Sequence, residues 1–426
     1  MNLIQRVTSS LSQNRAKLPK SNALAEVSME NNVIQGNNNT ITIINHSGLS
    51  AIADAQKADM EVFPLSKVYI TAQIPPEVAI LYIQADGKDR YRLMGGNSEI
   101  TLQLTEPYEK PDISLDVLVQ KGQTPEKIRH TIKCFSRHNL VLRKWLNTVI
   151  QKSDCKKYLV IADHTNFEIP WELLQLRPES FPYEYLGALV TTVRWQNIDS
   201  DDEITLEFAP EECCGDTIAY TNHQELNVSE EIMVLKRLKA NIFDDIAKFH
   251  GHLQIKSTNS SFIYIAAHGI FSKDHDDIAI GVLNNEKQQL KLIDLDMNPL
   301  KTGGIVFLNT CHSGQHQTHS RIPNCRVGFV ELFFRKGAKG VIGTLGGVGD
   351  LYAARIARDL MQACWDSSSL SVAALLRDIR AKVVADLEKE PTQHNHLAFI
   401  YTFMYVYYGN PMTVLRLTPS GGQTND

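Results

Sequence analysis

Three short apolar runs in the second half of the chain constrain the fold more than any other feature. The runs are SFIYIAAHG, GGIVFLNTC and AKGVIGTLG, and helical segments such as RVGFVELFFRKG and LYAARIARDLMQACW lie between or after them. A short continuous apolar run is typical of a strand that is covered on both faces. Strands that alternate with helices form βαβ units, so the sequence predicts an α/β fold with a mostly parallel sheet flanked by helices.

Two of these runs end in residues that can carry out chemistry. SFIYIAAHG ends at His268 and Gly269, and GGIVFLNTC ends at Cys311. Functional residues gather at the carboxyl ends of the strands in such sheets, and neighbouring strands lie about 4.8 Å apart. If the two runs are adjacent parallel strands, the imidazole and the thiol emerge at the same edge of the sheet.

A histidine beside a cysteine indicates nucleophilic catalysis. The thiol becomes a good nucleophile when it loses its proton, and a nearby imidazole promotes that loss. The backbone N–H groups of Gly269 and Cys311 could form an oxyanion hole, worth about 3 kcal/mol per donor. Most buried cysteines are inert core residues, so each residue alone is weak evidence. The order and spacing of His268 and Cys311 nevertheless fit a caspase-type arrangement.

Metal and phosphate binding are the alternatives. Five potential zinc ligands fall within 15 residues: Cys311, His312, His316, His319 and Cys325. Their spacing matches no zinc-finger template, and the histidines lie in a polar loop. The segment GTLGGVGD, residues 343–350, lacks both the Lys-Ser/Thr of a P-loop and the GxGxxG spacing. We therefore expect no metal and no cofactor.

The segment GTLGGVGD is better explained as part of a peptide-binding groove. Its glycines leave the backbone accessible, and Asp350 is expected to be the N-cap of the helix that follows. The functional alternative for Asp350 is a carboxylate in a specificity pocket for a basic substrate side chain.

The sequence divides into four parts. Residues 1–60 are an Asn-rich tail, whose composition suits a flexible segment, one short hairpin or a cross-β stack. Residues 61–150 alternate apolar and polar positions in KVYITAQI, AILYIQAD, EITLQLTE and ISLDVLVQ, which predicts a small β-rich module, followed by a helix. The α/β domain spans 151–417, and 418–426 is a flexible C-terminal tail.

Bulk properties exclude several classes of protein. The net charge is −5 and no long basic block occurs, which argues against nucleic acid as a partner. No run of 18 apolar residues occurs, so we expect no membrane span. The seven scattered cysteines form no CxxC pair, and the N-terminus lacks the apolar run of a secretion signal, so we expect a cytoplasmic protein.

Four segments together resemble the CHAT domain, a branch of the caspase-like cysteine peptidases related to separase. YLVIADHTNFEIPWELLQL resembles the upstream signature with its Pro-Trp-Glu-Leu-Leu motif, FIYIAAHG the His-Gly block, and IVFLNTCHSG the Cys block. GAKGVIGTLGGVGDLYAARIARDL resembles the strand, loop and helix that follow. The resemblance covers roughly residues 150–417, and it implies a caspase-like cysteine endopeptidase.

The resemblance also implies roles for individual residues. His268 would be the general base and Cys311 the nucleophile, with oxyanion donors from Gly269 and Cys311, and Glu172 would be structural. The position two before the nucleophile often helps to form the pocket for the residue preceding the scissile bond. This position is Asp in many metacaspases and Asn309 here. A strict preference for a basic substrate residue before the scissile bond is therefore not implied.

The remaining pocket residue implied by the resemblance is Asp350, which lies in a segment that corresponds to a pocket-forming loop. Asn309 and Asp350 are therefore the expected substrate-binding residues. A preference for a basic substrate residue before the scissile bond is left open as an alternative.

The resemblance implies a prokaryotic effector in antiphage defence or regulated cell death, with a gasdermin among the expected substrates. Residues 31–45 resemble short amyloid-type signalling motifs, so an upstream sensor or adaptor is an expected partner. The alternative is a non-catalytic scaffold assembled through that motif. Intact His268 and Cys311 favour the enzyme, because a scaffold needs neither.

Overall fold

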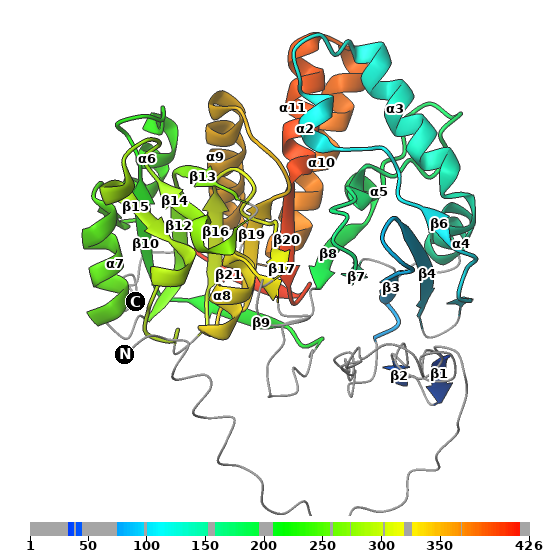
Figure 1. Ribbon diagram of the computed structural model, residues 1–426, viewed down its shortest axis with the longest axis horizontal. Coiled ribbons are helices and arrows are strands. Elements are labelled where there is room, and N and C mark those ends of the chain that lie inside the picture. The colour runs from blue at the N-terminus through cyan, green and yellow to red at the C-terminus, as the bar shows by residue number, and fades with distance from the viewer. Residues whose placement is uncertain are drawn as a thin grey trace, which may run out of the picture.

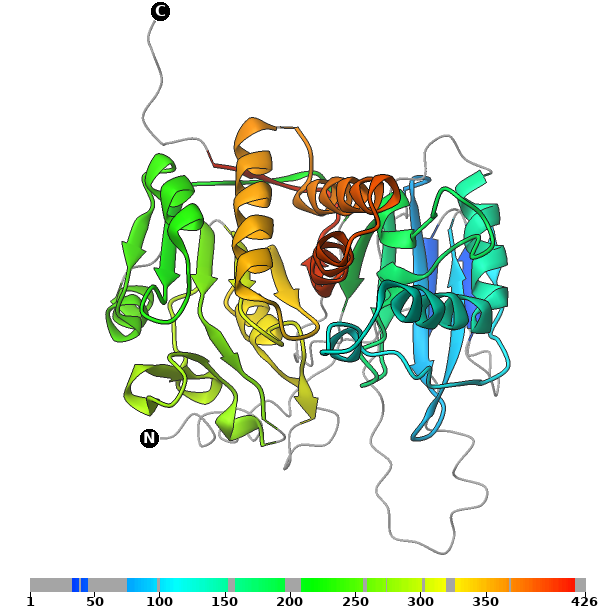
Figure 2. The same cartoon turned by 90° about the horizontal axis from the view of Figure 1, so that it is seen from above.

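The structure of the chain is a computed structural model (Figure 1). It describes these residues: 33–37, 40–44, 75–97, 100–151, 158–195, 208–255, 259–272, 274–300, 303–318, 326–367 and 369–417. The centre of the molecule is a twelve-stranded mixed sheet with helices on both faces. Figure 2 shows the same arrangement from above.

The central sheet is mostly parallel. The five strands β11, β10, β12, β16 and β19 are parallel, β20 runs antiparallel to β19, and β8, β7 and β3 are parallel to β20 and to one another. In spatial order the strands are β11 (Asn241–Phe243), β10 (Asp216–Thr221), β12 (Ser260–Ala266), β16 (Ile305–Asn309), β19 (Gly340–Thr344), β20 (Tyr405–Gly409), β8 (Thr191–Trp195), β7 (Tyr158–Asp163), β3 (Val78–Ala85), β4 (Arg90–Gly96) and β5 (Thr101–Leu102), with β6 (Tyr108–Glu109) paired to β4.

The apolar runs are covered on both faces, as predicted. In β12, Ile263 and Ile265 face one core, and Phe262 and Tyr264 face the other. Side chains alternate between the faces of a strand, so an uninterrupted apolar run has both faces buried. The second core is covered by α6 (Ser229–Arg237), α9 (Asp350–Asp366) and the start of α10 (Val372–Lys389). The first is covered by α3 (Pro125–His138), α4 (Leu140–Gln151), α5 (Leu186–Leu189), α7 (Ile246–Ile255), α8 (Phe329–Arg335) and α11 (Gln393–Met404).

The β-rich segment before residue 150 extends the central sheet. Its hairpin of β3 and β4 joins β7 through a parallel pair in which Ile80 is opposite Val160. The segment ISLDVLVQ is not a strand, contrary to the prediction: it contains the short helix α2 (Leu115–Leu118). Leu115 and Leu118 are both buried, and a separation of three residues places them on one face of a helix. KVYITAQI lies outside the described residues.

Four smaller pairings lie outside the central sheet in the described ranges. Beside the carboxyl end of β12 lies a three-stranded sheet of β13 (His268–Ile270), β14 (Ala279–Gly281) and β15 (Gln289–Lys291). The strands β1 (Val33–Asn37) and β2 (Thr40–Ile44) form an antiparallel hairpin within the Asn-rich part. The other pairs are β17 (Gln317–Thr318) with β18 (Arg326–Val327), and β9 (Glu211–Cys214) with β21 (Thr413–Arg416).

None of the helices in the described ranges is both long enough and apolar enough to cross a bilayer.

Candidate active site

His268 and Cys311 leave the sheet at the ends of neighbouring strands. β12 and β16 are parallel, and Ala266 pairs with Asn309, so His268 and Cys311 each follow two residues after the last paired position. The predicted adjacency of these two strands is confirmed. The backbones also touch: a Cβ at Gly269 would overlap the carbonyl of Cys311. Only glycine allows the chain after His268 to lie against the nucleophile candidate.

A cavity of about 150 Å³ opens at this edge of the sheet. Four of the predicted site residues line it: His268, Asn309, Cys311 and Asp350. A space of this size admits a side chain rather than a single water molecule.

The imidazole of His268 is held by a carboxylate that the sequence analysis missed. His268 Nε2 lies 3.4 Å from Glu225 Oε2. The same oxygen accepts hydrogen bonds from the Leu283 N–H at 2.9 Å and from Asn222 Nδ2 at 3.1 Å. Glu225 follows β10, the parallel neighbour of β12, so the carboxylate comes to the same sheet edge by the same geometric rule. The polar residues that follow the apolar run DTIAYT were the sequence feature from which a functional side chain at this sheet edge could have been predicted.

The thiol of Cys311 is partly buried against the loop after β19. Its Sγ accepts a hydrogen bond from the Val348 N–H at 3.4 Å and lies 3.8 Å from the Val348 carbonyl oxygen. Burial raises the pKa of the Cys311 thiol above its ordinary value, and the Val348 N–H acts in the opposite direction. A thiol with a raised pKa is protonated at neutral pH, so reaction requires a base.

The loop that carries Val348 is held by a residue from the N-terminal part of the chain. Asp116 Oδ1 accepts a hydrogen bond from the Gly347 N–H at 2.6 Å, and Asp116 Oδ2 lies 3.8 Å from His312 Nδ1. Asp116 lies on α2, which the sequence analysis treated as a strand, so its position beside the nucleophile was not foreseen. Its negative charge further raises the pKa of the Cys311 thiol.

Replacing Asp116 by asparagine is therefore expected to lower the pKa of the Cys311 thiol. The amide oxygen still accepts from Gly347, but the charge that disfavours the thiolate is gone. The measurement is the pH dependence of Cys311 alkylation by iodoacetamide, followed by mass spectrometry, with exposed Cys214 as an internal reference. Asp112→Asn is the matched control on the exposed surface. An unchanged or upward-shifted profile in Asp116→Asn would contradict the expectation.

The side chain of Asn309 is buried and lines the cavity. Its Nδ2 donates to the Tyr264 hydroxyl at 2.9 Å, and its Oδ1 accepts from the Tyr405 hydroxyl. Both ends of the amide are thus engaged with buried tyrosines.

Asp350 lies at the cavity but is not a helix N-cap, contrary to the prediction. It is the first residue of α9, and Gly349 occupies the cap position. Asp350 Oδ2 accepts a hydrogen bond from the Asn227 N–H at 3.0 Å. The carboxylate therefore connects the start of α9 to the loop before α6.

The histidines after Cys311 do not gather around a common point in the part of the chain that the structure describes. His316 Nε2 lies 3.2 Å from Asn166 Oδ1, whereas His312 stacks on Phe271. No group of three or more His, Cys, Asp or Glu side chains is arranged to hold a metal ion within the described ranges. His319 and Cys325 lie outside them.

The Pro-Trp-Glu segment lies in the core. Glu172, on the 3₁₀ turn η1 (Trp171–Leu173), forms a buried ion pair with Arg194, with Nη2 to Oε2 at 2.6 Å and Nε to Oε1 at 3.0 Å. Both side chains are almost fully buried. This contact connects η1 to β8.

The parallel sheet places a histidine and a cysteine after the ends of adjacent strands. Residues 219–400 match the model of the CHAT domain family. The match begins in β10 and ends in α11, and it includes His268 and Cys311 but not Asp116. The resemblance that the sequence motifs indicated is confirmed.

Solved structures that align with this chain include two of gingipain and one of separase. The complex of the Porphyromonas gingivalis RgpB pro- and mature domains aligns with a TM-score of 0.42 and 10% identity, over 66% of this chain and 70% of that one. The Arg specific cysteine proteinase gingipain R gives 0.41 and 9%, over 70% of each chain. The Saccharomyces cerevisiae separase–securin complex gives 0.36 and 14%, over 70% of this chain and 20% of the other. No curated protein matches the chain in sequence.

Proposed function

We propose that this chain is a cysteine endopeptidase that hydrolyses a peptide bond in a protein substrate. The observation that most strongly supports this proposal is that His268 and Cys311 follow adjacent parallel strands and line one cavity. The CHAT domain supports a peptidase-like fold, and the backbones of residues 269 and 311 lie in close contact.

In the proposed reaction, Cys311 Sγ attacks the carbonyl carbon of the scissile bond, and the thiol proton passes to His268. The tetrahedral oxyanion is stabilised by the backbone N–H groups of Gly269 and Cys311. The imidazolium then protonates the leaving amine, which departs and leaves a thioester on Cys311. Water, deprotonated by His268, attacks the thioester and releases the carboxylic acid, and the thiol is restored.

Glu225 acts in this scheme as a positioning residue. Its carboxylate is itself fixed by Leu283 and Asn222, so the imidazole that contacts it is held in one orientation. A carboxylate beside an imidazole also stabilises the positive charge that forms during proton transfer.

Before the first step, the thiol of Cys311 must give up its contact with Val348 and interact with His268. In the structure, Cys311 Sγ is hydrogen-bonded to Val348, while His268 Nε2 contacts Glu225. Movement of the 346–348 loop, which Asp116 holds, would free the thiol for proton transfer to His268. The proposed resting state is therefore one with low nucleophilicity.

The proposed biological setting is antiphage defence or regulated cell death in a bacterial cytoplasm, with a gasdermin as a candidate substrate and residues 31–45 as the segment that meets a sensor or adaptor. This setting rests on the CHAT domain and the Asn-rich composition. A purely scaffolding role is less well supported, because it gives no reason for the arrangement of His268, Glu225 and Cys311.

The function is tested by incubating the full chain and Cys311→Ala with a peptide library and an alkylating probe. The expected result is cleavage by the unmodified chain and none by Cys311→Ala, because removing the nucleophile removes the covalent route. Cys214→Ala, which removes an exposed thiol, should cleave normally. The enzyme hypothesis fails if the unmodified chain cleaves nothing under any activating condition and the probe labels the cysteines without preference.

A further inference from the structure

We propose that the free edge of the central sheet at β5 is the docking site of the β1–β2 hairpin of the same chain. In this arrangement β2 lies beside β5, in the groove between β5 and α4, and extends the sheet. The inference concerns the N-terminal part of the chain and does not depend on the proposed peptidase activity.

The edge of the sheet at β5 is open in the part of the chain that the structure describes. There β5 is the last strand on its side, and it pairs only with β4, with Leu102 opposite Gly95. Alternate residues of an antiparallel edge strand direct their N–H and C=O groups away from the sheet. Such an edge is a template for a further strand, and proteins usually cover it or protect it with charges. In residues 100–106 the only charged residue is Glu106.

A groove of about 560 Å³ runs along this edge. One wall is the segment 100–106, and the other is α4, from which Val141, Trp145 and Thr148 line the groove. Their spacing of four and three residues places them on one face of the helix. Val141 is 45% exposed. The groove therefore offers a docked strand both an open backbone edge and an uncovered apolar helix face.

The indole of Trp145 indicates that an acceptor is missing from this groove. The side chain is 5% exposed, and its Nε1 is buried with no hydrogen-bond partner among the described residues. An indole N–H can only donate, and a buried donor without an acceptor is unfavourable. A carbonyl or amide oxygen of a docked strand would accept this hydrogen bond.

The β1–β2 hairpin has the pattern that such a site requires. A two-stranded hairpin alone is at best marginally stable in water. Residues opposite each other in an antiparallel pair share a face, so the register places Ile34, Ile41 and Ile43 on one face. The opposite face includes the pair of Gln35 and Thr42. The first face suits contact with α4, and the second suits contact with water.

Charge and chain length also fit this occupant. The hairpin segment 33–44 has no charged residue, and the groove lining contains one charge of each sign, Glu106 and Lys144. A neutral hairpin therefore meets no electrostatic repulsion there. Residues 45–74 connect the hairpin to the segment before β3, and a chain of about 30 residues can span about 100 Å. The edge at β5 is two strands from β3, which is roughly 10 Å.

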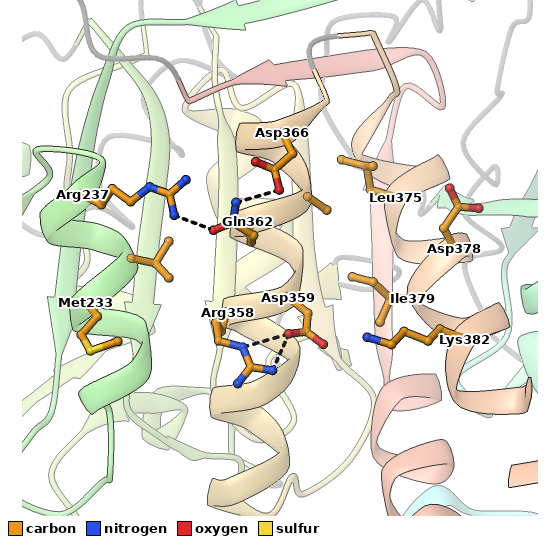
Figure 3. A pocket seen from close by; sticks show the side chains of 12 residues that line it. Met233, Arg237, Arg358, Asp359, Gln362, Asp366, Leu375, Asp378, Ile379 and Lys382 are labelled. Carbon is orange, nitrogen blue, oxygen red and sulfur yellow. Dashed lines mark hydrogen bonds and ion pairs between the residues drawn. The ribbon is translucent and has the colours of Figure 1, made fainter. Parts of the chain in front are cut away.

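The groove between α6, α9 and α10 is built differently (Figure 3). It has a volume of about 580 Å³. Within it Arg237 donates to Gln362, and Gln362 donates to Asp366, so polar groups of the groove partner one another. Its walls are helices, whose backbone groups are paired internally. The groove beside β5 therefore carries the stronger indication of a docked segment.

The test follows hydrogen exchange in the full chain by mass spectrometry. We expect slow exchange in residues 100–106, because the docked strand pairs the outward N–H groups. Ile43→Pro removes an N–H and fixes a backbone angle within β2. Val141→Asp places a charge in the apolar part of the groove. Each substitution should raise the exchange rate of residues 100–106 by at least about 10-fold.

Ser50→Pro and Leu140→Asp are the matched controls. Ser50 follows the hairpin segment in the sequence. Leu140 is 46% exposed, neighbours Val141 on α4 and is not among the residues that line the groove. Both controls should leave the exchange of residues 100–106 unchanged. Circular dichroism confirms that all four variants are folded.

Three results would overturn the inference. Fast exchange of residues 100–106 in the unmodified chain would show that the edge is open. Slow exchange that persists in Ile43→Pro would exclude the hairpin as the occupant. Protection that is lost when the protein is diluted would assign the edge to a second copy, because docking within one chain does not depend on concentration.

Discussion

Replacing His268 by alanine is expected to lower kcat for peptide hydrolysis by about 10²- to 10⁴-fold, the usual contribution of a general base. Burial raises the pKa of the Cys311 thiol, so few molecules carry a thiolate at neutral pH without assistance. His268 lines the same cavity and is oriented by Glu225. The measurement is steady-state cleavage of the best peptide from the library, with KM determined separately.

Two variants sharpen this experiment. His312→Ala removes the histidine next to the nucleophile, whose ring stacks on Phe271, and it should cost far less activity than His268→Ala. Glu225→Gln should lower kcat by an intermediate factor, because the imidazole stays but loses the charge that stabilises its protonated form. If His312→Ala is the more damaging change, the assignment of the base to His268 is wrong.

Replacing Glu172 by alanine is expected to lower the free energy of unfolding by about 3–5 kcal/mol, the cost of leaving a buried charge without its partner. Arg194 is 5% exposed and donates to Glu172 through Nη2 and Nε. A further hydrogen bond, from Nη2 to the Ile169 carbonyl oxygen at 2.8 Å, does not neutralise it. Urea denaturation followed by circular dichroism measures the difference.

The pair Glu212 and Arg416 is the control for this prediction. It has the same two-point geometry, with Nη2 to Oε1 at 2.6 Å and Nε to Oε2 at 2.9 Å, but it is exposed. Glu212→Ala should therefore change stability little. Glu172→Ala combined with Arg194→Met should recover part of the loss, because Arg194 is then no longer a buried charge, whereas the buried Arg380, which also interacts with Glu172, still lacks this carboxylate. A small effect of Glu172→Ala alone would contradict the structural role assigned to the Pro-Trp-Glu segment.

The pH dependence of stability should reflect the same pair. Burial alone would raise the pKa of Glu172, but Arg194 holds it below its ordinary value. A carboxyl whose pKa is depressed on folding contributes stability above its unfolded pKa, and the contribution is lost as the pH falls through the folded value. The pair should thus stabilise the protein at neutral pH and lose its effect only in strong acid.

The sequence by itself determined the parallel strands and the two residues at their ends. An uninterrupted apolar run such as FIYIAA or IVFL is stable only where both faces are covered, and that requirement selects an interior strand of a parallel sheet. The positions of His268 and Cys311 follow, because the polar residue after each run must lie at the carboxyl edge. These are local properties of the chain.

Only the tertiary structure decided which other side chains meet there. Glu225 and Asp116 come from the loop after β10 and from α2. Their proximity to the nucleophile depends on the order of strands in the sheet and on the packing of α2 against the loop at 346–348. Strand order and helix packing are set by contacts between distant segments, which no local pattern of residues encodes. The candidate dyad was therefore predictable from the sequence, whereas the carboxylates around it were not.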